Sequence, residues 1–288
     1  MLLFEYHPNC LKNALIAPIP KPNKFDFASP KAYRPISLLE TLSKLFEKIM
    51  AVRFTALSGL HRLIPPEQFG GKDMTSCMDA GLSLVHDIER AWAEKNRASI
   101  TLLDISGYFN NIDHDLLVRC MEKMGYPPRV LGWLRSYLSD RTASFRINDK
   151  VGAAFELKGR GIPQGSPLSP VFSSIFTAPM LASLRARGVQ VRAYIDDLCI
   201  FEQGDSQESC IAGLLDGTRA TLEALADMGL SAERSKTELI HFARNAREMT
   251  KNLPLVLRDK AEDTVRGASA VRIMYREWLQ GPSASWEE

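Results

Sequence analysis

Apolar positions along this chain follow two different periods, and the alternation between them predicts its secondary structure. A short apolar run that stops at turn-forming residues is the pattern of a strand. On this basis strands are predicted within residues 14–19, 100–105, 189–201 and 236–242. The third of these segments consists of two strand-like runs hinged on Asp196 and Asp197.

Apolar residues spaced three and four positions apart predict the helices. They cover residues 40–57, 76–94, 113–124, 128–138 and 208–228, and a further apolar helix runs to about residue 185. In the first helix the helical spacing is formed by Leu42, Leu45, Phe46, Ile49, Val52 and Phe54. In the second helix the predicted face consists of Leu82, Val85, Ile88 and Trp92.

Proline, glycine and asparagine clusters separate these elements and predict loops. A loop after the first strand runs through Phe25–Ala32 into Tyr33–Leu39. Asn148-Asp149 lies at the centre of a predicted hairpin over residues 142–158. Gly159–Ser169 forms a glycine- and proline-rich loop. Helices interleaved with strands of mixed spacing indicate an α+β fold.

Composition excludes several classes of protein. The 288 residues suit one large domain or two ordinary ones, and 45% hydrophobic with 24% charged residues is the balance of a soluble globular chain. No stretch approaches the roughly 18 uninterrupted apolar residues of a membrane span, so no membrane partner is expected. The N-terminus lacks the features of a secretion signal, which predicts an intracellular protein.

The five cysteines are scattered and include no CxxC pair, so we expect neither a zinc site nor disulfide staples. Charge is distributed unevenly. Residues 1–72 hold ten Lys/Arg and five Asp/Glu, a net +5, whereas the remaining residues hold 26 and 29, a net −3. The basic surplus at the front would suit a phosphate-handling element, although a solvated basic face explains it equally simply.

Candidate chemistry lies in aspartates at the ends of apolar strands. Asp104 closes one strand, and Asp196-Asp197 interrupts another. Burying adjacent carboxylates is costly unless a cation compensates them, and Mg²⁺ prefers oxygen ligands of this kind. Two such ions would stabilise the attacking and leaving oxygens of phosphoryl transfer. Taken alone, Asp196-Asp197 also fits an exposed β-turn with two solvated aspartates.

The neighbouring residues favour the catalytic interpretation. Tyr194–Asp197 resembles the Tyr-x-Asp-Asp box of reverse transcriptases, and Arg160–Pro170 (RGIPQGSPLSP) is similar to the Gly-x-Pro-Gln-Gly segment of that family. Four more segments resemble family motifs in the family's order: Ile19–Lys24 (IPKPNK), Tyr33–Leu39 (YRPISLL), Leu103–Ile112 (LDISGYFNNI) and Gly229–Phe242 (GLSAERSKTELIHF). With Gln68-Phe69-Gly70, this set is most similar to the non-LTR (LINE-type) retrotransposon polymerases.

The resemblance implies metal ligands. Asp104 and Asp196 would be the principal carboxylate ligands of two Mg²⁺ ions, with Mn²⁺ as a substitute. Asp197 would support them, and the carbonyl of Ile105 would complete a coordination shell. Asp104, Asp196 and Asp197 would therefore be the catalytic residues.

The resemblance also implies substrate contacts. Lys21 and Arg34 match the cations that hold the incoming triphosphate. Phe109 matches an aromatic gate that excludes a 2′-hydroxyl, and Gln164 with Gly165 would shape the nucleotide and template pocket. Ordinary core packing of Phe109 and solvated surface positions for the two cations are the alternatives.

Lys236 matches a later lysine of the family, a candidate proton donor to pyrophosphate or a triphosphate contact. A simple charge at the start of a strand explains it as well. His114 lies between Asp113 and Asp115, where the sequence predicts that Asp113 caps the following helix rather than activates the histidine.

Three segments depart from the family pattern. Asn110 stands where relatives usually have aspartate, and Gly71–Ala80 lacks their basic, Arg-Ser-Thr-rich stretch. Ala270–Glu288 departs after Val271-Arg272, where a primer-grip hairpin and thumb would follow.

The resemblance implies a right-hand polymerase with fingers and palm, an antiparallel palm sheet packed on helices, and a thumb that is absent or incomplete. Residues 1–98 would be fingers, with 140–160 contributing, residues 99–243 the palm, and residues 244–288 a degenerate or truncated primer-grip and thumb start.

The function implied is RNA-directed DNA polymerisation by two-metal-ion nucleotidyl transfer, with an RNA template, a DNA primer and deoxynucleoside triphosphates as partners. A nuclear or cytoplasmic ribonucleoprotein location would follow; the oligomeric state is unknown. Two alternatives remain. One is a decayed, non-catalytic remnant that at most binds nucleic acid, and the other is an RNA-dependent RNA polymerase, which Phe109 disfavours.

Overall fold

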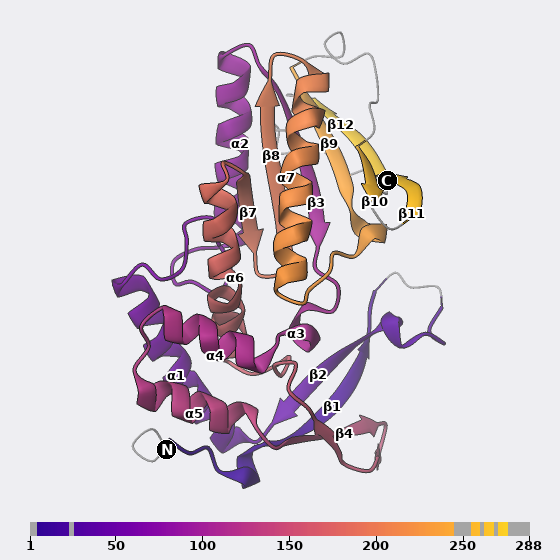
Figure 1. Ribbon diagram of the computed structural model, residues 1–288. Helices are drawn as coiled ribbons and strands as arrows, with labels where there is room; N and C mark the ends of the chain where they lie inside the picture. The colour runs from indigo at the N-terminus through magenta and orange to yellow at the C-terminus, as the bar shows by residue number, and fades with distance from the viewer. Residues whose placement is uncertain (1–4, 23–25, 245–254, 260–261, 268–269, 276–288) are drawn as a thin grey trace. The chain divides into compact units, whose positions relative to one another are not determined.

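A computed structural model describes residues 5–22, 26–244, 255–259, 262–267 and 270–275 (Figure 1). The chain divides into two compact units, each assembled from separate stretches. Unit 1 comprises residues 1–64, 71–73 and 107–179; unit 2 comprises residues 65–70, 74–106 and 180–288. The boundary near residue 179 falls within helix α6 (Ser169–Ala186), at its internal Pro179.

Unit 2 is built on a sheet with the strand order β12-β9-β3-β8-β7. The strands are β3 (Arg97–Asp104), β7 (Gln190–Tyr194), β8 (Asp197–Gly204), β9 (Glu238–Ala243) and β12 (Ala270–Tyr275). All neighbouring pairs are antiparallel except β12–β9, which is parallel. Strand β3 has a strand on each side, and its interior residues Ala98–Thr101 are buried.

Helices cover both faces of this sheet. Helix α2 (Cys77–Ala93) packs Ile88, Ala91 and Trp92 on the face that carries Ile100 and Phe201. Helix α7 (Gln207–Asp227) lies over the sheet in Figure 1. A methyl group on its Gly217 would lie 3.2 Å from Ile200, so this helix packs on the opposite face.

Unit 1 contains a second, smaller sheet with the order β2-β1-β4, extended by β5 and β6 beside β4. The strands are β1 (Asn13–Pro20), β2 (Tyr33–Leu39), β4 (Arg141–Ile147), β5 (Lys150–Val151) and β6 (Phe155–Leu157). Its buried face is small and consists of Ala14, Ile16, Leu39 and Ala143.

The core of unit 1 contains an aromatic cluster that lies between helices. These helices are α1 (Thr41–Leu60), α3 (Tyr108–Asn111), α4 (His114–Lys123), α5 (Pro128–Leu138) and the first part of α6. Trp133 stacks on Tyr137, and Phe54 and Phe172 surround this pair at ring distances between 5.8 and 6.3 Å. Such rings supply most of the apolar area that a small core needs.

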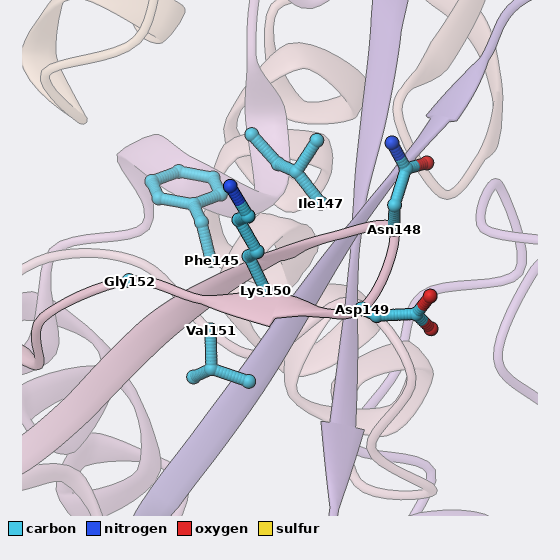
Figure 2. A pocket seen from close by; sticks show the side chains of 7 residues that line it. All are labelled: Phe145, Ile147, Asn148, Asp149, Lys150, Val151 and Gly152. Atoms are coloured by element: carbon cyan, nitrogen blue, oxygen red, sulfur yellow. The ribbon is translucent and has the colours of Figure 1, made fainter.

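The remaining short elements are η2 (Asn9–Leu11), η3 (Pro30–Ala32), η4 (Arg234–Lys236), β10 (Val256–Asp259) and β11 (Glu262–Gly267). The predicted hairpin turns at Asn148-Asp149 as expected, because Ile147 pairs with Lys150. Figure 2 shows Phe145, Ile147 and Lys150 on one side of this hairpin and Val151 on the other. The apolar face of the sheet therefore continues past the buried core to an exposed edge, where Phe145 stacks on Phe155.

The apolar residues whose spacing identifies the first helix do not coincide with its buried face. Leu42, Leu45, Ile49 and Val52 are 46–64% exposed, whereas the opposite face is buried and carries Ser43, Glu47 and Ser58. Of the six apolar residues that show the helical spacing, only Phe54 is fully buried. The buried polar residues all have partners across unit 1, which a helical periodicity cannot reveal.

Smaller differences have similar causes. Tyr33–Leu39 is strand β2 and not a continuation of the loop, because it pairs along its whole length with β1. In α2, Leu82 is 64% exposed, and Leu84 packs against the core instead. Asp113 caps α4 as predicted, with its side chain accepting a hydrogen bond from the backbone of Leu116. The predicted divergence of Ala270–Glu288 falls partly outside the described residues, since 276–288 are not among them.

Candidate active site

Two of the predicted aspartates lie side by side at the end of the sheet in unit 2. Asp104 is the last residue of β3, and Asp197 is the first residue of β8. The antiparallel register pairs these two residues directly. Directly opposed residues project from the same face of a sheet, with Cβ atoms about 5 Å apart. The register therefore brings together carboxylates that are 93 positions apart in the chain.

Asp196 lies in the two-residue turn that joins β7 to β8. Tyr194 pairs with Asp197, so that Ile195 and Asp196 form the loop. Ile195 has a φ of 61°, a left-handed conformation that is rare for a β-branched residue. The carbonyl of Asp196 accepts a hydrogen bond from the backbone of Ile105 at 3.2 Å. This contact places the Ile105 backbone beside the turn.

Burial and neighbouring carboxylates raise the pKa values of Asp196 and Asp197. Burial raises the pKa of Asp196 to about 6, and the charges of Asp197 and Asp104 add to the rise. Burial also raises the pKa of Asp197, again with a contribution from Asp104. Like charges in a partly buried site oppose ionisation unless a cation compensates them. The site therefore holds more negative charge than its own surroundings neutralise.

Lys236 supplies part of the compensating charge. Its ammonium lies 2.8 Å from a carboxylate oxygen of Asp104, and its side chain is 57% exposed. The lysine belongs to η4, which follows a segment that bonds to the end of β3: the backbone of Glu233 donates to the Asp104 carbonyl at 2.7 Å. The structure thus brings Lys236 together with the three aspartates.

The donor set suits a hard divalent cation. All side-chain ligands offered are carboxylate oxygens, and their mutual repulsion would be relieved by a positive ion between them. In the described part of the chain, however, no three His, Cys, Asp or Glu side chains already converge as a metal-binding group. The carboxylates thus match magnesium in the chemistry of their oxygen donors and not as a converged group of ligands.

A groove of about 630 Å³ opens beside these residues within unit 2. Asp104, Asp197 and Lys236 line it, together with Gly81 of α2 and Tyr194 of β7. Arg192 crosses the same face, donates to Ser83 at 3.1 Å and forms an ion pair with Asp87, which joins α2 to β7. Asp104 and Asp197 consequently line an open space of the size that small-molecule sites have.

The two predicted triphosphate cations lie near each other in unit 1. Arg34 is in β2 opposite Ile19, and Lys21 follows the end of β1. Arg34 is exposed, and the ammonium of Lys21 donates to the carbonyl of Lys31 at 2.9 Å. Both cations therefore flank the loop that joins β1 to β2.

Phe109, Gln164 and Gly165 are also brought together in unit 1. The carbonyl of Phe109 accepts a hydrogen bond from Ile162, at the start of the loop that carries the other two residues. The Gln164 carbonyl accepts from the backbone of Ser37 at 2.6 Å. Gly165 has a φ of 122°, and a Cβ there would lie 2.5 Å from the Ser37 carbonyl oxygen. Only glycine permits this approach of loop and strand.

Glu47 is a residue whose part in this loop the sequence analysis missed. It is fully buried in α1, and its two carboxylate oxygens accept from Ser43 at 2.7 Å and from Ser166 at 2.5 Å. Ser166 follows Gly165 directly, and its hydroxyl also accepts from the backbone of Leu168. A charged residue among the apolar positions of a helix was the available signal, since such residues are buried only when paired.

The raised pKa of Asp196 leads to a test of stability. Below about pH 4 the carboxyl is protonated in both states, whereas between about pH 4 and 6 only the folded state keeps the proton. Folding therefore loses stability as the pH rises through this window. Without divalent ions, Asp196→Asn should be more stable than the wild type at pH 8 by about 1–2 kcal/mol, after allowance for solvent screening.

Urea denaturation at pH 4 and pH 8 in a chelator measures this difference. The gain should vanish at pH 4, and Asp149→Asn, at the exposed hairpin tip, should behave like the wild type at both pH values. Equal stability of Asp196→Asn and wild type at pH 8 would contradict the raised pKa assigned to Asp196.

Known proteins resemble this chain in sequence. Residues 19–269 match the family model described as reverse transcriptase (RNA-dependent DNA polymerase). A probable RNA-directed DNA polymerase from transposon BS of Drosophila melanogaster is 31% identical over 74% of this chain, and that from transposon X-element is 26% identical over 84%. The chain spans 24% and 27% of the lengths of these two relatives.

The fold also occurs among solved structures. An apo telomerase from Candida tropicalis, truncated from its C-terminal domain, aligns with a TM-score of 0.55 at 13% identity. The alignment covers 84% of this chain and 52% of the telomerase. At this identity the likeness concerns the fold alone. No described helix has the length and apolar character needed to cross a membrane.

Proposed function

Because this chain belongs to the reverse transcriptase family, and within it to the non-LTR (LINE-type) retrotransposon polymerases, we propose that it extends a DNA primer with deoxynucleotides on an RNA template. The observation that supports this most directly is the pairing of Asp104 with Asp197 next to the Asp196 turn. In this proposal residues 1–98 act as fingers with 140–160, residues 99–243 as palm, and 244–288 as the start of a primer grip.

The carboxylates of the palm would hold the metal. Asp104 and Asp196 would be the principal ligands of two Mg²⁺ ions, Asp197 would support them, and the Ile105 carbonyl would complete the shell. Such ions, when bound, stabilise the charge that develops on the attacking and leaving oxygens of phosphoryl transfer. Mn²⁺ offers the same preference for oxygen ligands and would replace Mg²⁺.

Lys236 would move within this site. Its ammonium pairs with Asp104 and would neutralise that carboxylate until a metal ion binds it. Its exposed side chain would then reach the leaving pyrophosphate, either as a proton donor or as a phosphate contact. Both roles use a lysine that is paired but not buried.

The substrate would be bound by residues of unit 1. Lys21 and Arg34 would hold the triphosphate, with the guanidinium offering a fixed fork and the ammonium a point charge. Gln164 and Gly165 would line the nucleotide and template pocket on a loop that Ser37 and Glu47 hold in place. An intracellular ribonucleoprotein, in the nucleus or the cytoplasm, is the location that suits these substrates.

Primer extension tests the proposal. The chain is incubated with an RNA template, an annealed DNA primer, deoxynucleoside triphosphates and Mg²⁺, and extended products are measured. Templated incorporation that a chelator abolishes is the expected result. If the chain fails where a version lengthened to include a thumb succeeds, it is a non-catalytic portion. A preference for ribonucleotides would instead identify an RNA-dependent RNA polymerase.

Phe109 provides a test of sugar selection. If its ring excludes the 2′-hydroxyl, Phe109→Ala should raise ribonucleotide incorporation relative to deoxynucleotide incorporation by about 10- to 100-fold, the range of shape-based discrimination. The neighbouring Tyr108 is buried and its hydroxyl donates to Ser173, so Tyr108→Phe serves as a control that leaves the ratio unchanged. An unchanged ratio in Phe109→Ala would show that this ring serves ordinary core packing and does not select the sugar.

A further inference from the structure

Residues 67–69 run alongside β7, the strand that leads into the Asp196 turn. Gln68 forms a parallel bridge with Ala193. The backbone of Phe69 donates to the Ala193 carbonyl at 2.8 Å, and the backbone of Ala193 donates to the Glu67 carbonyl at 2.8 Å. This segment therefore pairs with the edge of the sheet, immediately before the turn. It belongs to unit 2 together with the three aspartates.

The side chain of Gln68 reaches the turn itself. The residue is fully buried, with 0% of its surface exposed. Its carboxamide oxygen accepts two backbone hydrogen bonds, from Ile195 at 3.0 Å and from Gly70 at 2.9 Å. A buried backbone N–H that loses its acceptor is destabilising, so this oxygen favours the conformation in which the Ile195 N–H points toward it.

Ile195 needs such support. Its φ of 61° is normally adopted by glycine, and a β-branched residue held there is strained. The positive φ at the first residue of a two-residue loop is the type II′ pattern, in which glycine predominates. The strained residue immediately precedes Asp196, so its backbone conformation determines the position of the Asp196 Cα and the direction of its side chain.

Gly70 completes the contact. A Cβ at Gly70 would lie 2.5 Å from Cγ1 of Ile195 and 2.8 Å from its backbone nitrogen. The segment can therefore approach the turn this closely only with glycine at this position. Gln68 and Gly70 together contact both the backbone and the side chain of the strained residue.

We propose that Gln68 is a positioning residue for Asp196: its carboxamide oxygen fixes the left-handed conformation of Ile195 and so orients the Asp196 carboxylate toward the divalent cation. This role rests on the proposed polymerase function. Gln68 touches neither substrate nor metal, and acts through the turn alone. Removing its oxygen should leave the three carboxylates present but less well arranged.

The first experiment does not depend on activity. Gln68→Met keeps the length of the side chain but removes the acceptor, so backbone hydrogen exchange at Ile195 should accelerate at least 10-fold. Ser99→Ala is the matched control, because Ser99 is equally buried in the same unit and bonds to His241. It should destabilise unit 2 without a selective change at residues 193–197. Unchanged exchange at Ile195 in Gln68→Met would overturn the proposal.

The second experiment uses the metal. The Mg²⁺ concentration that gives half-maximal primer extension should rise about 5- to 10-fold in Gln68→Met and stay unchanged in Ser99→Ala. Adding Ile195→Gly should reverse most of that rise, since glycine adopts a positive φ without strain. Failure of this rescue, or an equal shift in Ser99→Ala, would show that Gln68 merely stabilises the fold.

The two proposals fail in different ways. If the wild-type chain incorporates no nucleotide, the polymerase proposal fails, while protection of the Ile195 amide still tests the contact. In that case the Mg²⁺ midpoint is measured from the rise in thermal stability of the full chain. Gln68→Glu, which retains an acceptor oxygen of the same reach, should keep the amide protected in either case.

Discussion

Asp104→Asn and Asp196→Asn are each expected to reduce nucleotide incorporation by at least about 1,000-fold, because the charge stabilisation that bound metal supplies amounts to several kcal/mol. An amide keeps the size of a carboxylate but removes the charge on which a hard cation depends. Asp104 also pairs with Lys236, so its replacement releases that ammonium into the site. Primer extension at saturating Mg²⁺ measures both variants.

Asp205→Asn is the appropriate control for this loss. Asp205 is exposed, follows the end of β8 in the same unit, and should leave the rate unchanged. A second measurement separates metal binding from folding: Mg²⁺ should raise the thermal midpoint of the wild type and of Asp205→Asn, but barely raise that of Asp196→Asn. Substantial incorporation by Asp196→Asn would show that Asp196 is not a catalytic residue.

Glu47→Ala is expected to cost about 3 kcal/mol of folding free energy, since it removes a buried acceptor from two hydroxyl groups. Ser43 and Ser166 would both lose the partner to which they donate. Ser166 also contacts the Tyr137 hydroxyl at 3.3 Å, so the disturbance would reach the aromatic core of unit 1. Urea denaturation gives the difference directly.

Neighbouring variants identify the source of this effect. Lys48→Ala, on the exposed side of the same helix, should change stability by less than about 0.5 kcal/mol. Glu47→Gln retains one acceptor oxygen and should lose less stability than Glu47→Ala. A loss in Glu47→Ala no greater than in Lys48→Ala would contradict the importance of the buried hydrogen bonds.

Local patterns were sufficient to predict most elements of this fold. The helix predicted over 128–138 is α5 with those bounds, and the hairpin at Asn148-Asp149 turns where its two residues predict. Both depend on neighbouring positions in the chain: a proline at the helix start, and asparagine with aspartate in a tight turn. Such signals need no knowledge of distant partners.

The face of α1 could not be predicted in this way. Its exposed side is the more apolar one. Glu47 is buried and accepts a hydrogen bond from Ser166, which lies 119 positions away in the sequence. Apolar spacing reports hydrophobic burial alone. It carries no information about a helix that is held to its unit by hydrogen bonds from a distant loop.

In the candidate site, too, some features could be predicted from local sequence and others could not. The residues Asp104, Asp196 and Asp197 are identifiable because each interrupts or ends an apolar strand, and their proximity follows from an antiparallel register. The strain at Ile195 has no counterpart in the sequence, where isoleucine suits a strand. Gln68 was visible only as part of Gln68-Phe69-Gly70, and its contact with the turn depends on pairing across 127 positions.

The central position of β3 has a consequence for how the chain emerges from the ribosome. β3 ends at Asp104, but its partners β8 and β9 begin only at Asp197 and Glu238. At 5–20 residues per second, this apolar strand waits about 5–20 seconds before even its first neighbour is translated. Unpaired apolar strands of this kind invite association between chains. A lower growth temperature, or a chaperone that shields nascent β3, should therefore improve the yield of folded protein more than any substitution on the surface of the folded protein.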